Sequence, residues 1–422
     1  MKTGMTAIVA ALFLVLPGRS PAGESEDLTL RLSVGNQRYK DKIVHIRPGS
    51  IVSARTGRAM PEKAVLRDLQ RADFVYIGET HDSLPMHEVQ LRVLQALHGA
   101  GGKDLAVGVE MFPASSQAVL DRWSGGELSE EDFLRASRWY VTWNFHWGYY
   151  NGLFDFARRN AVPVVGLNVA REIIAKIRRG GWASLSDEEK TLVPEPDLSN
   201  PDHRALMKAV FSGENMPPQM RGEGFEKVFE GLYRAQSAWD EVMASNADRA
   251  SDSGKRKVLV LAGSGHLIYN LGINRRVFER NGRPFRTVVC VSVPRDRPSV
   301  AVSRSLADYI WGLAEEERPA FPSVGLRLKT FDGLANLVVE AKPADGVARG
   351  RDFEKGDVIL SVDGMLFSDL NELRMHLARY GWGEEAAFRL LRSGQEKTAV
   401  LKFDPPASPA EADKTAQEGR RP

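Results

Sequence analysis

Residues 258–266 read VLVLAGSGH, an unbroken apolar run that ends in a glycine-rich turn and a histidine. Five consecutive apolar residues are typical of a strand that is buried on both faces of a parallel sheet. Ligands of such sheets bind beyond the carboxyl ends of the strands, where glycines permit sharp turns and a close approach to the backbone. The stretch therefore predicts both a central strand and a candidate site residue, His266.

The same pattern recurs on both sides of this stretch. Short apolar runs lie at 74–77, 105–109, 162–167 and 286–293. Segments with a helical spacing of apolar residues alternate with them, at 61–72, 86–97, 115–123, 153–159, 172–178 and 224–249. This alternation predicts an α/β domain over residues 50–300, with a mostly parallel sheet flanked by helices.

Polar side chains stand at the ends of four predicted strands. They are Glu79, His81, Glu110, Asn168, Arg171 and His266. Because parallel strands share a direction, we expect these side chains to converge on one rim of the sheet. Carboxylates and imidazoles in one pocket can hold a divalent metal (Mn, Co, Zn or Fe), catalyse acid–base chemistry, or contact a cofactor such as haem. The candidate catalytic and metal-ligating residues are Glu79, His81, Glu110 and His266, and their spacing does not select among these uses.

An aromatic segment offers a second group of candidates. Three tryptophans lie four residues apart between positions 139 and 147, which on a helix would form one stripe for core packing. The alternative is an apolar wall for a flat ligand, from which His146, Tyr149 or Tyr150 could reach a haem iron. Both readings stay open from the sequence.

The long predicted helix adds Gln236 and Asp240 to the candidate cofactor contacts. They lie four residues apart and share a face, so they either line the pocket or face solvent. Four other histidines are expected at the surface, although His87 could also line the rim: His45, His87, His98 and His203.

At these motifs the domain resembles the ChaN-like haem-binding family of the wider Tiki/erythromycin-esterase superfamily. The resemblance rests on residues 76–81, 108–112, 150–168, 235–236, 240, 243–244 and 263–266. It implies a protein tied to iron or haem acquisition, with the four rim residues named above in its pocket. The wider superfamily includes hydrolases, some of which need a divalent metal. Haem ligation in the ChaN group involves a tyrosine and a histidine across a dimer, which implies a homodimer as a candidate assembly.

A second module follows at residues 321–404. It resembles a PDZ domain, above all in GDVI at 356–359 and VDG at 362–364. An exposed strand after Gly325 would accept a partner's C-terminal peptide as an extra strand, and backbone amides would capture its carboxylate. The predicted peptide-binding residues are Gly325, Leu326, Leu373 and Leu377. Residues 405–422 are expected to form a disordered tail.

Composition and the first residues bear on location and partners. A net charge of +2 gives no basic field for nucleic acid. Lys2, the apolar run 5–16 and the small residues Ser20 and Ala22 are typical of a secretory signal over residues 1–22. The single cysteine, Cys290, follows at a distance, so no lipid anchor is evident. These features predict export to a bacterial periplasm or beyond.

Three functions are consistent with these features. The leading hypothesis is an exported, ChaN-like binding protein for haem or another small ligand, with a PDZ-like module that binds a peptide. The first alternative is a metal-dependent or histidine/glutamate-dependent hydrolase that uses the rim residues. The second is a PDZ scaffold with an inactive pocket.

Overall fold

The structure is a computed structural model that describes residues 28–101, 104–211, 225–331, 334–367 and 369–406. Its contacts divide the chain into two compact units. Unit 1 comprises residues 1–81, 85–124 and 156–315, and unit 2 comprises residues 82–84, 125–155 and 316–422. The predicted signal at 1–22 and most of the predicted tail lie outside the described residues. Among the described residues, no helix has the length and apolar composition needed to cross a membrane.

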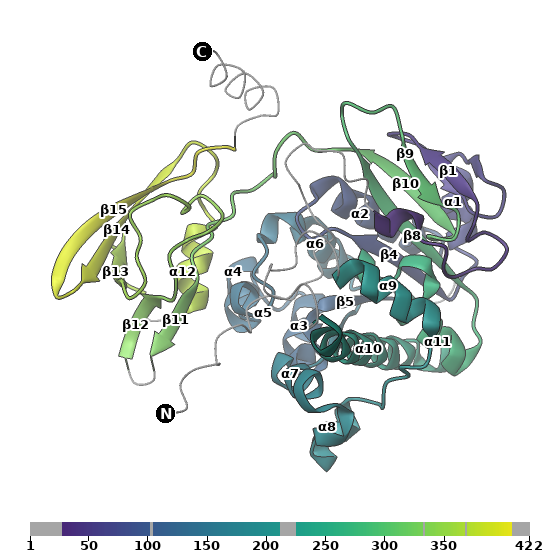
Figure 1. Ribbon diagram of the computed structural model, residues 1–422, viewed down its shortest axis with the longest axis horizontal. Helices are drawn as coiled ribbons and strands as arrows, with labels where there is room; N and C mark the ends of the chain where they lie inside the picture. Colours follow the sequence, from purple (N-terminus) through teal and green to yellow (C-terminus); the bar gives the residue numbers. More distant parts are fainter. Residues whose placement is uncertain (1–27, 102–103, 212–224, 332–333, 368, 407–422) are drawn as a thin grey trace. The chain divides into compact units, whose positions relative to one another are not determined.

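Unit 1 is built on an eight-stranded mixed sheet (Figure 1). In spatial order its strands are β3 (Arg58–Ala59), β2 (Ile51–Ser53), β10 (Tyr309–Ala314), β8 (Phe285–Val293), β4 (Phe74–Glu79), β7 (Arg256–Gly263), β5 (Asp104–Pro113) and β6 (Val164–Asn168). The six strands from β10 to β6 are parallel, whereas β2 and β3 add an antiparallel edge. A separate pair joins β1 (Ile43–Ile46) to β9 (Val300–Ser303). The predicted α/β class is confirmed.

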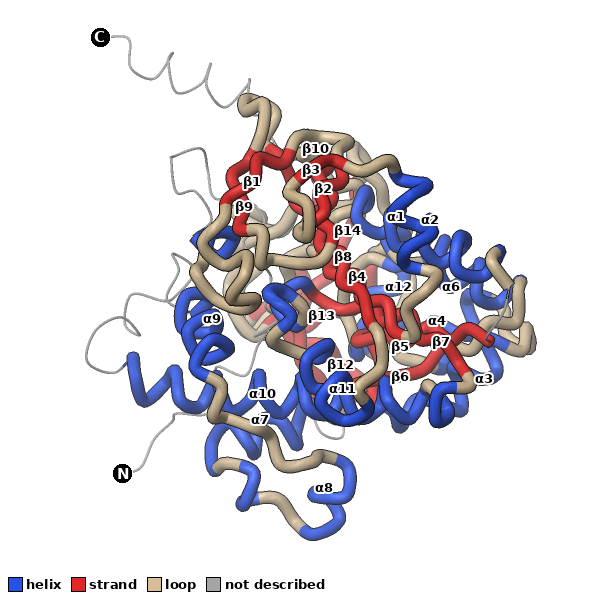
Figure 2. The backbone as a smooth tube through the Cα atoms, turned by 90° about the vertical axis from the view of Figure 1, so that its right-hand side faces the viewer, coloured by secondary structure: helices blue, strands red, loops and turns tan. Residues whose placement is uncertain are grey.

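Helices cover both faces of this sheet (Figure 2). The helices of unit 1 are α1 (Glu62–Leu69), α2 (Leu84–Gly99), α3 (Gln117–Ser124), the end of α6 (Asn151–Arg159), α7 (Arg171–Gly180), α8 (Asp187–Leu192), α9 (Pro201–Phe211), α10 (Phe225–Ala250) and α11 (Ile273–Asn281). Helices α10 and α11 pack on the face that carries Tyr76 and Val260, and α1 and α2 lie on the other side. Because both faces are covered, consecutive strand residues such as Val260 and Leu261 are equally buried, although their side chains point to opposite faces of the sheet.

Unit 2 contains a five-stranded antiparallel sheet. Its order is β11 (Leu328–Phe331), β12 (Leu334–Val339), β13 (Val358–Val362), β14 (Glu385–Arg392) and β15 (Gln395–Lys402). One helix, α12 (Leu370–Leu377), begins at Asp369, whose carboxylate accepts hydrogen bonds from two backbone N–H groups of the first turn. Leu373 and Phe388 are fully buried in the core of this unit. The expected separate β-rich sheet is confirmed.

Residues 125–155, which we call the insert, belong to unit 2 although the sequence pattern assigns them to the first domain. They form α4 (Glu130–Ala136), α5 (Trp139–Thr142) and the short helix η3 (Trp147–Tyr149). All three tryptophans of the segment are buried, which favours core packing over the alternative of a ligand wall. They do not lie on one helix, because Asn144 has a φ of 68° and interrupts the helical path.

Candidate functional site

Four predicted residues meet where the parallel strands end. Glu79 is the last residue of β4 and pairs in register with Gly263 of β7. Glu110 lies on β5, and His266 lies on the short helix η7 (Ser264–His266) that follows β7. Their exposed fractions are small: 2% for Glu79, 3% for His81, 6% for Glu110 and 4% for His266. The structure thus brings distant sequence segments together in one buried cluster.

Glu79 holds His81 on one side of this cluster. Its Oε1 atom lies 2.8 Å from Nδ1 of His81, and its Oε2 atom lies 3.5 Å from Nδ1 of His87. The amide of Gln90 donates to the same Oε2 at 2.5 Å. Burial by itself raises the pKa of Glu79, but His87, His81 and Gln90 together lower it to about 2. Glu79 is therefore ionised at neutral pH and fixes the orientation of His81.

His266 lies between two carboxylates on the other side. Its Nδ1 atom is 2.5 Å from Oδ1 of Asp240, and its Nε2 atom is 3.4 Å from Oε1 of Glu110. Burial lowers the pKa of His266, but Glu110 and Asp240 outweigh it and raise the pKa to about 10. Gln236 also contacts this ring, with Nε2 2.8 Å from Nδ1. His266 is therefore an imidazolium at neutral pH, so in this state it cannot act as a general base.

Glu110 is fixed by the backbone around it. Its Oε2 atom accepts a hydrogen bond of 2.6 Å from the N–H of Gly263. The Asn168 side chain at the end of β6 donates to the carbonyl of Glu110 at 3.1 Å. A Cβ atom on Gly263 would lie 3.0 Å from the ring of His81 and 3.6 Å from Oε2 of Glu110. Glycine at position 263 is therefore what lets these two side chains lie over the end of β7.

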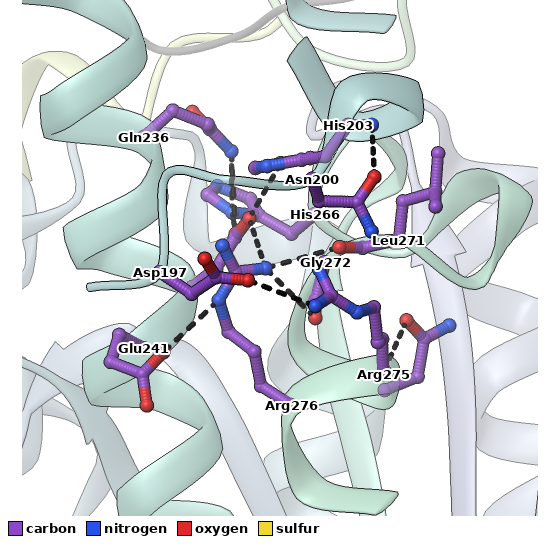
Figure 3. A network of polar contacts seen from close by, with 12 residues as sticks. Asp197, Asn200, His203, Gln236, Glu241, His266, Leu271, Gly272, Arg275 and Arg276 are labelled. Atoms are coloured by element: carbon purple, nitrogen blue, oxygen red, sulfur yellow. Dashed lines mark hydrogen bonds and ion pairs between the residues drawn. The ribbon is translucent and has the colours of Figure 1, made fainter. Parts of the chain in front are cut away.

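Asp240 contacts His203, His266 and Arg276, which Figure 3 shows within one polar network. Its Oδ2 atom lies 3.2 Å from Nε2 of His203 and 3.5 Å from a guanidinium nitrogen of Arg276. Arg276 also lies 3.2 Å from Glu241 and donates to the carbonyl of Gly272 at 3.2 Å. Charge stays balanced, since ionised carboxylates face imidazolium and guanidinium groups. Burial lowers the pKa of His203, which favours its neutral form.

The prediction for His203 was wrong, because it was expected at the surface and is 0% exposed. His87, expected at the surface with the rim as the alternative, is 4% exposed, and His45 and His98 are exposed as predicted. The helical spacing carried a signal for both residues. His87 shares a buried face with Gln90, and His203 shares one with Leu206 and Met207.

Some of the other predicted cofactor-binding residues lie in unit 1 and some lie in unit 2. Gln236 and Asp240 are buried against His266, so they line the site and do not face solvent. Arg171, the first residue of α7, is exposed. His146, Tyr149 and Tyr150 belong to unit 2.

These three aromatic candidates have partners within unit 2. Nε2 of His146 lies 2.8 Å from the carbonyl of Ala378, and its Nδ1 accepts from the N–H of Gly148 at 3.0 Å. The hydroxyl of Tyr150 accepts from Trp143 at 3.0 Å, and burial raises the pKa of Tyr149. These contacts do not favour a phenolate or a free imidazole for an iron ligand here.

The predicted peptide-binding residues surround α12 and the loop before β11. Leu326, Leu373 and Leu377 are buried, with exposed fractions of 7%, 0% and 3%. Gly325 has a φ of 75°, and a Cβ atom there would lie 2.0 Å from the carbonyl of Asp345. The loop therefore requires glycine at this position.

The cluster does not form a bare metal site. Among the described residues, no group of three His, Cys, Asp or Glu side chains is placed to hold a metal ion. Asp240 and Glu79 instead hold the Nδ1 side of His266 and of His81. Such carboxylate–histidine pairs orient an imidazole and raise its basicity, as they do around metal-ligating histidines.

Comparisons with known proteins give one family and one fold. The family model described as "Haem-binding uptake, Tiki superfamily, ChaN" matches residues 65–277. The solved structure "Cofacial heme binding to ChaN of Campylobacter jejuni" is 19% identical, with a TM-score of 0.50 over 64% of this chain and 96% of that chain. At that identity the likeness shows the fold.

A second solved structure matches a smaller part of the chain. It is the structure "HtrA-type protease AlgW with decapeptide". The protease is 26% identical to this chain, and the match covers 21% of this chain and 30% of that chain with a TM-score of 0.18. The comparison with curated proteins returned no match.

Proposed function

Because the chain belongs to the family of haem-binding uptake proteins of the Tiki superfamily, ChaN, we propose that it binds haem and that His266 supplies an iron ligand. The observation that carries this assignment is the pairing of His266 with Asp240, whose Oδ1 atom lies 2.5 Å from Nδ1. The pair fixes the ring by its Nδ1 side and directs Nε2 towards Glu110. A bound haem would supply an iron centre that an imidazole nitrogen could hold.

The side chains present fit this role in their donor chemistry. Imidazole is a common axial ligand of haem iron, and a carboxylate on its other nitrogen makes it a stronger donor. His266 must release its Nε2 proton to become a ligand, and Glu110 lies on that side of the ring, 3.4 Å away. His81, held by Glu79 in the same way, is the second candidate.

A titration of the purified chain with haem tests this proposal. We expect a saturable Soret band that is distinct from that of free haem, and a fixed stoichiometry at the end point. Iron-free protoporphyrin serves as the comparison, because it offers no metal to an imidazole and should bind more weakly. A linear rise in absorbance with no end point would refute haem binding.

We also propose that unit 2 binds the free C-terminus of a partner peptide. In the described part of the sheet, β11 is the edge strand and pairs with β12 alone, so its other side can accept a further strand. The loop that contains Gly325 precedes this edge, and α12 lies beside it. An apolar C-terminal residue would suit the leucines that surround the loop and the helix. Binding of labelled peptides with a free or an amidated C-terminus tests this role, since amidation should abolish it.

Export and a role in iron uptake complete the proposal. They are supported by the leader pattern at residues 1–22 and by the description of the family. Cell fractionation of the full chain tests export, because a periplasmic protein should be released by osmotic shock and should lack its first residues. Retention of the uncleaved chain in the cytoplasm would contradict it.

A further inference from the structure

The insert contacts one side of α12 through backbone and side-chain hydrogen bonds. The N–H of Tyr140 donates to Oδ1 of Asn371 at 3.0 Å, and Arg374 donates to the carbonyl of Tyr140 at 2.7 Å. Asn371 in turn donates to the carbonyl of Leu134 at 3.2 Å. Asn371 and Arg374 lie one turn apart on α12, so the insert covers a continuous stripe of this helix.

His146 extends this contact to one end of the proposed peptide groove. Its Nε2 atom lies 2.8 Å from the carbonyl of Ala378, which directly follows the predicted groove residue Leu377. Its ring stacks on Phe321, with ring centroids 3.9 Å apart and planes at 10°. Phe321 lies four residues before Gly325, in the segment that leads into the predicted carboxylate-binding loop. One imidazole therefore connects the segment before this loop to the end of α12.

The insert is shaped to receive the ring of Phe321. Tyr149 contacts the same ring edge-on, with centroids 4.9 Å apart. A Cβ atom on Gly148 would lie 2.3 Å from Cζ of Phe321, so the ring lies directly on the backbone of this glycine. The N–H of Gly148 also donates to Nδ1 of His146 at 3.0 Å, which fixes the imidazole that stacks on Phe321.

We propose that His146 and Phe321 form a clamp that closes the carboxylate end of the peptide groove, so that a free C-terminus binds only when the clamp opens. The proposal rests on the peptide-binding role inferred above and adds its regulation. The contact of His146 with Ala378 supports it, because Ala378 directly follows the predicted groove residue Leu377. The ligand that fits is a peptide with a free carboxylate and an apolar last residue, which opens the clamp at a cost in affinity.

Two single variants of the full chain open the clamp in different ways. Gly148→Ala places a methyl group where the ring of Phe321 lies, and it removes no polar group. Phe321→Ala removes the ring itself. The matched control is Gly381→Ala in the same unit, because a Cβ atom there meets its nearest atom, an oxygen of Glu384, at an ordinary distance of 3.6 Å. Thermal unfolding of each variant checks that unit 2 remains folded.

The measurement is the fluorescence anisotropy of a labelled decapeptide that ends in valine with a free carboxylate. We expect both clamp variants to bind it at least about tenfold more tightly than the unaltered chain and the control, with no such gain for the amidated peptide. Equal affinity in all four proteins would overturn the clamp but leave peptide binding standing. If none of the four binds a series of peptides with different apolar ends, the peptide-binding role fails, and the clamp fails with it.

Discussion

Oδ1 of Asp240 lies 2.5 Å from Nδ1 of His266, in a part of unit 1 where neither residue is more than 4% exposed. This pair connects α10 to the end of β7 and joins the rim site to the network of His203 and Arg276. Its geometry determines which ring nitrogen faces Glu110. The predicted haem affinity of the site depends on this pair.

Asp240→Asn should weaken haem binding while it preserves the shape of the site. Without the carboxylate, the ring of His266 loses the acceptor that fixes its Nδ1 side, so we expect a loss in affinity of about 10- to 100-fold. The Soret titration measures this loss. Glu241→Gln is the control on the same helix, because Glu241 pairs with Arg276 and Arg280 and not with a histidine. Equal losses in both variants would contradict a specific role for Asp240.

Stability should fall on both sides of neutral pH because of two buried groups. The pKa of Glu79 is lowered to about 2, so its contribution is present above its ordinary value of 4.5 and is lost as the pH falls towards 2. The pKa of His266 is raised to about 10, so its contribution is complete below 6.5 and is lost as the pH rises through 10. These shifts correspond to about 3 kcal/mol for Glu79 and about 5 kcal/mol for His266.

Urea unfolding at several pH values measures these two contributions. In Glu79→Gln the loss of stability in acid should be smaller, whereas the loss in alkali should remain. A stability that stays level from neutral to alkaline pH in the unaltered chain would show that His266 is not held as an imidazolium.

Gly272→Ala should disturb the site through its backbone. A Cβ atom at this position would lie 1.9 Å from the carbonyl oxygen of His266 and 3.3 Å from Oδ2 of Asp240. Since the backbone must shift, we expect a loss of about 1–3 kcal/mol in the free energy of unfolding and a weaker haem complex. Gly99→Ala, where a Cβ atom meets nothing within 4 Å, is the control for denaturant unfolding. Unchanged stability in Gly272→Ala would contradict the close packing.

The sequence was enough to predict five of the six parallel strands of unit 1 and the polar residues at their ends, but not β10, which lies beyond the predicted domain of residues 50–300. The reason is local, since unbroken apolar runs that end in glycine and a polar residue mark both a buried strand and its carboxyl end. His203 was missed because an imidazole on a helix gives no sign of burial until its apolar neighbours Leu206 and Met207 are counted on the same face.

The place of the insert could not be read from the sequence. Tyr140 and Asn371 are 231 residues apart, and their contact joins a backbone N–H to a side-chain amide. The spacing of apolar residues cannot predict a hydrogen bond of this kind. The three tryptophans indicated a core, but they did not indicate which unit the core belongs to.

The most direct test of the central claim is the absorption spectrum of the haem complex of His266→Ala, compared with that of Tyr150→Phe. If His266 is the iron ligand, its variant should show a shifted Soret band and an affinity at least about tenfold weaker, and the tyrosine variant should match the unaltered chain. An unchanged band and affinity in His266→Ala would contradict the assignment of the iron ligand to this site.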